Sequence, residues 1–175
     1  CGWPALGVQA KLTQMGSDGV GQVSLRGPAI VQNYWPQLPA LDEQGWFHTG
    51  YLARIDTDQS WRIVGRSKDM IISGGENIYP AEVEQVLQRH PAVQECAVVG
   101  LPDPKWGERV VAVVVLKPEL KAQDQDFLTP MQQQLARYKH PRQIVQVQEL
   151  PKTALGKIQK DQLTKQISES AHKEA

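Results

Sequence analysis

The chain has 175 residues, 41% of them hydrophobic, which is enough for one domain or for one domain and part of another. Its 19 Lys and Arg residues balance 19 Asp and Glu residues, so its net charge provides no attraction to nucleic acid or to an anionic membrane. No apolar run approaches the roughly 18 residues of a membrane-spanning helix. Two cysteines are too few for a disulfide framework or a metal cluster, so a reducing cytoplasm is the expected location.

The first 65 residues are predicted to form short strands separated by turns. Strands are expected at 7–12, 19–25, 46–47, 51–52 and 61–64. Alternating apolar and polar residues indicate half-buried strands in the first two cases, and residues 56–59 are typical of a hairpin turn. Because such strands without a helix make a poor independent domain, we expect them to belong to a sheet or small barrel whose other strands lie upstream.

Helices and strands are predicted to follow one another after residue 68. Strands are expected at 69–72, 93–100, 110–116 and 144–147, and helices at about 80–90, from about 126 or 130 to 137, and at 160–170. Residues 110–116 are all apolar and five are β-branched, which indicates a strand buried on both faces. This order predicts a compact α+β domain, and we place the boundary so that residues 1–66 are β-rich and residues 67–175 are α+β.

Two short runs contain residues suited to binding charged ligands. Lys157 ends the run Pro-Lys-Thr-Ala-Leu-Gly-Lys with a compact charge on a flexible stem, which suits a phosphate or carboxylate. Taken alone, this run is more simply a basic surface turn before a helix. Gly74 and Gly75, between a predicted strand and a predicted helix, can line a narrow ligand channel or cradle an anion. Their simpler reading is a tight strand-to-helix turn.

Two further runs are Gly-Trp-Phe-His-Thr-Gly-Tyr at 45–51 and Gly-Arg-Ser-Lys-Asp at 65–69. Arg66 could form a bidentate contact to a diol or phosphate, or a surface ion pair with Asp69. Trp46 and Phe47 are most simply core aromatic residues, and His48 is most simply a solvated loop histidine.

In their order and spacing, the four runs together resemble the adenylate-forming superfamily of acyl-CoA synthetases, luciferases and peptide-synthetase adenylation domains. The resemblance covers essentially the whole chain and extends to residues 21–28, 33–35, 98–108 and 138–141. The run Gly-Gly-Glu-Asn-Ile-Tyr-Pro and the motif around Trp106 resemble those of acyl- or aryl-CoA ligases more than those of peptide synthetases.

The resemblance implies that the chain is the C-terminal part of an AMP-forming acyl-CoA synthetase. Such enzymes convert a carboxylic acid, ATP and CoA to acyl-CoA, AMP and pyrophosphate, with Mg²⁺ implied, through an acyl-adenylate that the CoA thiol attacks. Residues 67–175 would be the lid domain, a small mixed sheet with helices. Residues 1–66 would be the β-rich end of the large AMP-binding domain.

The family's functional positions can be carried over residue by residue. The matching residues are Lys157 for the catalytic adenylation lysine, Arg66 and Tyr51 for nucleotide binding, Lys68 for the hinge on which the lid rotates, and Gly74, Gly75, Trp106, Tyr138 and His140 for CoA. Tyr51 departs from the family, which usually has Asp there. A phenol cannot accept two hydrogen bonds as a carboxylate does, so we expect a loss of about 1.5–3 kcal/mol in nucleotide affinity.

The family's Ser/Thr/Gly-rich phosphate loop, its acyl pocket and its magnesium-binding Glu would all lie upstream of residue 1. Residues 1–175 alone are therefore predicted not to adenylate and to bind no cofactor firmly. The expected partners are CoA, the acyl-adenylate and the large N-terminal domain, with a homo-oligomer through exposed sheet edges as a further possibility. The alternative is a stand-alone module that docks on a separate AMP-binding domain or binds CoA without catalysis. Exposed apolar residues within 1–65 would favour the fragment.

Overall fold

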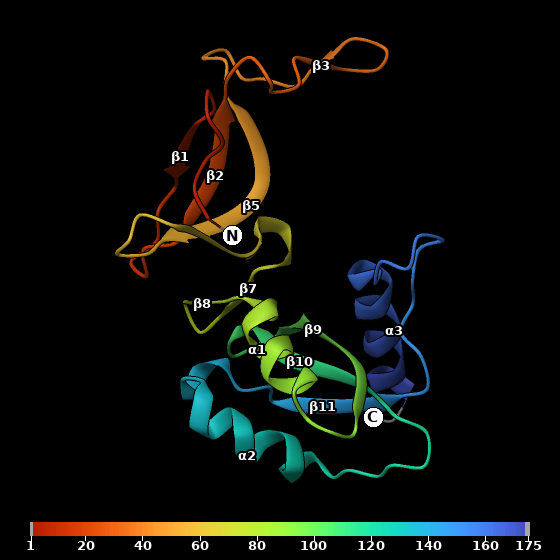
Figure 1. Cartoon of the computed structure of the whole chain (residues 1–175). Helices are drawn as coiled ribbons and strands as arrows, with labels where there is room; N and C mark the ends of the chain where they lie inside the picture. The colour runs from red at the N-terminus through yellow and green to blue at the C-terminus, as the bar shows by residue number, and fades with distance from the viewer. Residues whose placement is uncertain (1, 174–175) are drawn as a thin grey trace. The chain divides into compact units, whose positions relative to one another are not determined.

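The computed structural model describes residues 2–173, and the chain divides into two compact units between Lys68 and Asp69 (Figure 1). We call residues up to Lys68 unit 1 and residues from Asp69 unit 2. Each unit has its own sheet. The identity of unit 1 as the end of a larger domain stays a prediction.

Unit 1 contains a four-stranded antiparallel sheet with the order β1-β2-β5-β6. Its strands are β1 (Gln9–Thr13), β2 (Gly21–Arg26), β5 (Phe47–Ile55) and β6 (Trp61–Arg66), and β3 (Asn33–Tyr34) pairs separately with β4 (Leu38–Pro39). The predicted hairpin turn is present, because the Gln59 N–H donates to the Asp56 carbonyl at 2.9 Å. The two short pieces predicted at 46–47 and 51–52 correspond to one strand, β5, which begins at Phe47. Within this strand Gly50 has a φ of 71°, a conformation that glycine adopts easily.

Three predictions within unit 1 are wrong in detail. Trp46 and Phe47 are only partly buried, and the Trp46 ring instead lies 4.0 Å from Lys11 Nζ and 4.6 Å from the Arg26 guanidinium. His48 is in a strand rather than a loop, and its ring is hydrogen bonded on both sides, as described below. Alternation alone could not show that cations, not apolar residues, would cover Trp46.

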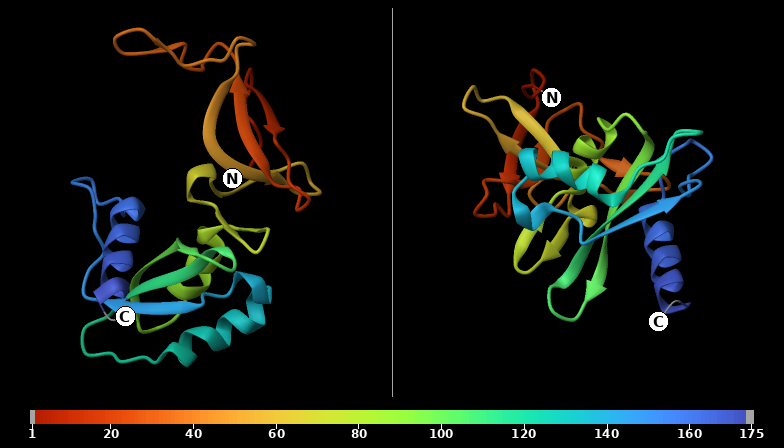
Figure 2. Two further views of the ribbon diagram at one scale, coloured as in Figure 1. Left: turned by 180° about the vertical axis from the view of Figure 1, so that it is seen from behind. Right: turned by 90° about the horizontal axis from the view of Figure 1, so that it is seen from below.

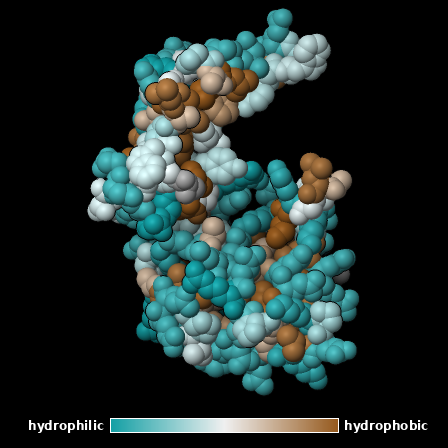
Figure 3. All heavy atoms as spheres, viewed as in Figure 1, coloured by the Kyte–Doolittle hydropathy of each residue, from teal (hydrophilic) through white to brown (hydrophobic). Residues whose placement is uncertain are grey.

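Large hydrophobic side chains are exposed over much of unit 1. Its buried hydrophobic residues are Val20, Val23, Leu52, Ala53 and Val64, whereas the exposed ones are Trp3, Leu6, Met15, Val31, Tyr34, Trp35, Leu38, Tyr51, Ile55 and Ile63. Figure 3 shows hydrophobic residues gathered on the surface of this unit. A patch of this kind commonly marks a surface that another protein segment covers.

Unit 2 is a five-stranded mixed sheet with helices on both faces (Figure 2). Its elements are the 3-10 turn η1 (Ser67–Asp69) at the boundary, β7 (Ile71–Ser73), β8 (Glu76–Ile78), α1 (Pro80–Gln88), β9 (Val93–Asp103), β10 (Gly107–Leu116), α2 (Asp124–Gln134), the 3-10 turn η2 (Arg137–Lys139), β11 (Gln143–Val147) and α3 (Lys160–Lys173). Strands β10 and β11 run parallel, and the other pairs are antiparallel. The predicted α+β fold with a small mixed sheet is confirmed.

Alternating residues of β9 and β10 build two separate cores. On one face, side chains such as Val98, Val110 and Ala112 pack against residues of α1 and α2. On the other face, side chains such as Val111 and Val113 pack against Leu163 and Ile167 of α3. Val110 through Val115 are each at most 5% exposed, so the prediction of a strand buried on both faces is confirmed.

The helix ends follow from local chemistry. Pro80 starts α1 where the predicted helix begins, and Glu82 lies in its first turn. Helix α2 begins and ends earlier than predicted, because Gln123 and Asp126 form a capping box at its start and Leu135 adopts an extended conformation at its end. Strand β8 was not predicted at all.

Candidate functional site

Three of the residues predicted to contact CoA line one open pocket of unit 2. Trp106, Tyr138 and His140 share this pocket, which has a volume of about 790 Å³. We call it the Trp106 pocket, and its lining is completed by Leu128, Gln132, Arg137, Pro141 and Arg142. The side chains come from the β9–β10 turn, from α2 and from the segment around η2, so only the tertiary fold brings them together.

Trp106 is held in the turn by its neighbours. The Asp103 carboxylate accepts hydrogen bonds from the N–H groups of Lys105 at 2.9 Å and Trp106 at 3.0 Å. The Gly74 N–H donates to the Trp106 carbonyl at 2.8 Å. The Arg142 guanidinium lies 4.3 Å from the centre of the indole ring, and Lys105 Nζ lies 5.0 Å from it. The backbone of Trp106 is therefore held by hydrogen bonds, and its ring lies next to two positive charges.

The η2 segment adds an exposed ring and a fixed histidine to the pocket. Tyr138 is 47% exposed, so its ring is available for stacking. His140 Nε2 lies 3.1 Å from the Leu135 carbonyl, and because a carbonyl can only accept, Nε2 is the protonated nitrogen. Lys139 is bound to Glu82 at 2.6 Å and its charge is neutralised there.

Arg137 and Arg142 are the two arginines of the lining, and the sequence reasoning missed both. The available signal was the basic and aromatic run Arg-Tyr-Lys-His-Pro-Arg at 137–142. Two aromatic rings with two guanidinium groups suit a ligand that has both a flat base and phosphates.

Gly74 and Gly75 form the tip of a β-hairpin between β7 and β8, which corrects the expected strand-to-helix turn. Ser73 pairs with Glu76, so only the two glycines lie in the loop. Their φ angles are 63° and 85°, as a type I′ turn requires at both positions. A Cβ at Gly74 would lie 2.8 Å from the Trp106 ring, whereas one at Gly75 would meet no atom within 4 Å. Gly74 thus borders Trp106, while Gly75 faces open space.

Lys157 ends a tight turn between β11 and α3. The Thr153 N–H donates to the Lys157 carbonyl at 2.8 Å, and the Lys157 N–H donates to Thr153 Oγ1 at 3.1 Å. Gly156 adopts a φ of 80° next to it. The lysine is exposed, and its ammonium forms no ion pair with any side chain that the structure describes.

The neighbouring lysines behave differently. Lys152 binds Glu95 at 2.5 Å, and Lys160 binds Glu84 at 2.6 Å. Among the described residues of this segment, Lys157 is therefore the exposed lysine whose ammonium is not paired with a carboxylate. It is not part of the Trp106 pocket lining.

Arg66 and Tyr51, the two predicted nucleotide contacts, are partners across strands β5 and β6. Arg66 Nη2 donates to the Tyr51 hydroxyl at 3.0 Å, and the guanidinium lies 5.1 Å from the phenol ring. The hydroxyl oxygen is thus engaged by the arginine. Lys68, the predicted hinge, is an exposed residue of η1 and the last residue of unit 1. Its role as a hinge stays a prediction.

A hydrogen-bonded series outside the predicted sites links Ser24, His48 and Asp42. The Ser24 hydroxyl lies 3.0 Å from His48 Nδ1, and His48 Nε2 lies 2.8 Å from the Asp42 carboxylate. The N–H of Trp46 also donates to this carboxylate and, as the main cause, holds the pKa of Asp42 below its ordinary value. Ser24 is fully buried and cannot meet a substrate, so the series fastens β2 to β5.

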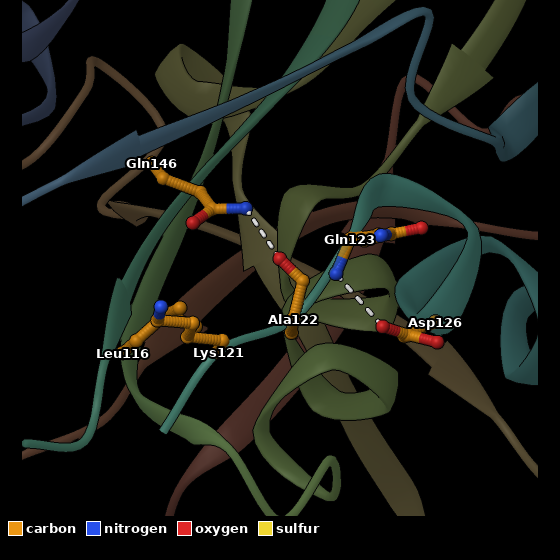
Figure 4. Close-up of a pocket in the computed structure, with 6 residues that line it drawn as sticks. All are labelled: Leu116, Lys121, Ala122, Gln123, Asp126 and Gln146. Atoms are coloured by element: carbon orange, nitrogen blue, oxygen red, sulfur yellow. Dashed lines mark hydrogen bonds between the residues drawn. The ribbon is translucent and has the colours of Figure 1, made fainter. Parts of the chain in front are cut away.

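A second pocket of about 640 Å³ lies beside the start of α2 (Figure 4). Gln146 Nε2 donates to the Ala122 carbonyl at 2.9 Å, and the Gln123 N–H donates to Asp126 at 2.7 Å. These polar groups are engaged with one another, and the pocket contains none of the predicted site residues. We assign it no binding role.

Among the described residues, no three His, Cys, Asp or Glu side chains are grouped to hold a metal ion. The described helices include none that is long and apolar enough to cross a membrane.

Comparison with known proteins identifies the family. The chain matches the AMP-binding enzyme C-terminal domain over residues 82–157. Its sequence relatives are acyl- and aryl-CoA ligases, and its structural neighbours are adenylate-forming enzymes. It is 43% identical over 150 residues to a feruloyl-CoA synthase of an Amycolatopsis species, covering 84% of this chain and 30% of that protein. It is 38% identical to a medium/long-chain-fatty-acid–CoA ligase of Mycobacterium tuberculosis, covering 98% of this chain and 33% of that protein.

Solved structures of superfamily members agree with this assignment. The o-succinylbenzoate CoA synthetase of Bacillus subtilis, solved with its acyl-adenylate intermediate, matches 91% of this chain and 34% of its own, with a TM-score of 0.83 and 34% identity. An anthranilate CoA ligase bound to anthranoyl-AMP matches 93% of this chain and 34% of its own, with a TM-score of 0.81 and 36% identity. The chain thus spans about a third of the length of the relatives that it matches.

Proposed function

We propose that these residues are the C-terminal part of an AMP-forming acyl- or aryl-CoA ligase, with unit 2 as its lid. The observation that carries this proposal is the Trp106 pocket, where Trp106, Tyr138 and His140 gather beside two arginines. An aromatic and cationic pocket fits the base and phosphates of CoA. The relatives are CoA ligases, which supports the same ligand.

In the first half-reaction, a substrate carboxylate oxygen attacks the α-phosphorus of ATP and pyrophosphate leaves. Negative charge then concentrates around the α-phosphate and the carboxylate. The exposed ammonium of Lys157, which has no partner among the described side chains, is suited to stabilise this charge. Mg²⁺ would balance phosphate charge, but the described residues offer no cluster to hold it, so we assign this chain no step through the metal.

In the second half-reaction, the CoA thiol attacks the acyl carbon of the adenylate and AMP leaves. The nucleotide end of CoA would occupy the Trp106 pocket, and the pantetheine arm would pass the Gly74–Gly75 tip. Gly75 faces open space and leaves room for a narrow chain, whereas Gly74 packs against Trp106. Lys157 and the Trp106 pocket lie on different loops of unit 2, so the two half-reactions would use different parts of the lid. Rotation about Lys68 would exchange them.

Unit 1 would pack against further strands of a large AMP-binding domain. Its ten exposed large hydrophobic residues support this interpretation. Residues 1–175 contain no phosphate loop, so we expect no ATP–pyrophosphate exchange from this chain alone. The Tyr51 hydroxyl is held by Arg66, and nucleotide binding would be weaker than with a carboxylate at that position.

A chimera tests these assignments. The upstream part of the Amycolatopsis feruloyl-CoA synthase, which this chain does not match, would be joined to residues 1–175. Lys157→Ala should abolish adenylation but spare thioester formation from a supplied acyl-adenylate, and Trp106→Ala should raise the KM for CoA and spare adenylation. Lys165→Ala, which removes an exposed lysine of α3, is the matched control for charge. Equal loss of both half-reactions in Lys157→Ala would contradict the proposal.

A further inference from the structure

Glu108 makes an unusual contact between β10 and the backbone of β7. Its Oε2 accepts a hydrogen bond from the Ile72 N–H at 2.7 Å. Strands β7 and β10 pair at a single position, Gly107 with Ser73, so the carboxylate supplies an acceptor that a longer ladder would otherwise provide. A charged acceptor makes this bond stronger than a neutral backbone pair.

Gly100 provides the space that this carboxylate occupies. Gly100 pairs with Val110 in the β9–β10 ladder, two residues from the Glu108 register position. A Cβ at Gly100 would lie 2.6 Å from Glu108 Oε1 and 3.1 Å from its carboxyl carbon. A side chain at position 100 would therefore displace the Glu108 carboxylate from its place beside Gly100.

The hydrogen bond between Glu108 and Ile72 lies next to the Gly74–Gly75 hairpin. Ile72 lies two residues before Gly74, and the Gly74 N–H donates to the Trp106 carbonyl at 2.8 Å. Glu108 in turn lies two residues after Trp106. Two hydrogen bonds thus connect β7 and its hairpin to the turn that carries Trp106, one from the backbone and one from Glu108.

We propose that Glu108 is a positioning residue, whose carboxylate, seated over Gly100, holds β7 so that the Gly74–Gly75 hairpin rests against Trp106. The consequence for CoA rests on the proposed function, but the placement of the hairpin does not. Residues 72–76 would lose their fixed position without the carboxylate.

Amide hydrogen exchange on the ¹⁵N-labelled chain tests the placement. Glu108→Ala should reduce protection of the Gly74 amide by roughly 10- to 100-fold, the effect of losing one charge-assisted hydrogen bond. Gly74 is the informative amide because its own acceptor, the Trp106 carbonyl, is still present. Val113, in the centre of β10, reports the stability of the whole unit and should change much less. Glu108→Gln retains an acceptor oxygen and should restore most of the protection.

Gly100→Ala is an independent test, because the new methyl group displaces the Glu108 carboxylate without removing it. It should loosen Gly74 as Glu108→Ala does, and the double variant should be little worse than either one. Equal loss of protection at Gly74 and Val113 would show a merely structural role, and additive effects of the two substitutions would likewise overturn the proposal. So would unchanged protection of Gly74 in Glu108→Ala.

Isothermal titration with CoA separates this proposal from the proposed function. If the unaltered chain binds CoA, Glu108→Ala should weaken binding by roughly 3- to 10-fold. The matched control Glu149→Ala, which removes an exposed carboxylate of a loop, should not. CoA binding that is unaffected by Glu108→Ala overturns the functional half. If the unaltered chain does not bind CoA, the proposed function fails, and the exchange data still decide whether Glu108 places the hairpin.

Discussion

Alanine substitutions at the two adjacent glycines of the β7–β8 hairpin should differ sharply in their cost. Both glycines have positive φ angles, 63° and 85°, so each alanine adopts a conformation that costs about 1–2 kcal/mol. At Gly75 this is the whole cost, because the new Cβ meets no atom within 4 Å. At Gly74 the Cβ lies 2.8 Å from Trp106 Cε3 and 3.1 Å from Cζ3.

The contact between a Cβ at position 74 and Trp106 sets the difference in stability between the two variants. The indole ring or the hairpin must move by about 0.6 Å before Cβ and Cε3 reach the 3.4 Å of ordinary contact. Forcing a methyl group into a packed site costs about 1–3 kcal/mol. We therefore expect Gly74→Ala to destabilise unit 2 by about 2–5 kcal/mol and Gly75→Ala by about 1–2 kcal/mol.

Urea unfolding followed by the Trp106 indole NMR signal measures this difference, because the signal reports unit 2 alone. The indole resonance should also shift in folded Gly74→Ala and stay in place in Gly75→Ala. Equal free energies of unfolding for the two variants, within about 0.5 kcal/mol, would refute the packing of Gly74 against Trp106.

Three further predictions concern charge and burial. The pKa of Asp42 is lowered by folding, so its carboxylate stabilises the fold above the ordinary pKa of 3.8, and this contribution is lost as pH falls through the folded-state pKa. Thermal unfolding between about pH 5 and pH 2 should therefore show a smaller loss of stability in Asp42→Asn than in the unaltered chain. Parallel losses of stability in the two proteins would contradict this. Glu84→Ala should destabilise unit 2 by about 1–3 kcal/mol in urea, because it leaves the half-buried Lys160 without its carboxylate. Burial raises the pKa of Cys96 to about 12, so iodoacetamide at about pH 8 should label it only in denaturant, as peptide mass spectrometry would show.

The elements of unit 2 were predictable where the sequence pattern is strong. The seven apolar residues of 110–116 and the Pro80 start of α1 both correspond to observed elements. Strand β8 was missed because three residues, Glu-Asn-Ile, are too few to show alternation. Two adjacent glycines also suit a two-residue hairpin, but the helix predicted next favoured a strand-to-helix turn.

The candidate site was predictable only in part. Trp106, Tyr138 and His140 came from the resemblance, and the fold places them in one pocket. Arg137 and Arg142 could not be chosen from other basic residues, because which cations face Trp106 depends on how the η2 segment packs. The contrast between exposed Lys157 and its bound neighbours Lys152 and Lys160 likewise depends on carboxylates that lie more than 50 residues away in the sequence.

We propose that unit 2 binds the nucleotide end of CoA at the Trp106 pocket. The most direct test is a titration of the ¹⁵N-labelled chain with CoA, followed through the Trp106 indole and the Tyr138 and His140 amides. We expect saturable shifts of these signals, and an affinity for CoA that is at least about tenfold weaker in Trp106→Ala, which removes the stacking surface. No shift at millimolar CoA, or saturation with the same affinity in Trp106→Ala, would contradict it.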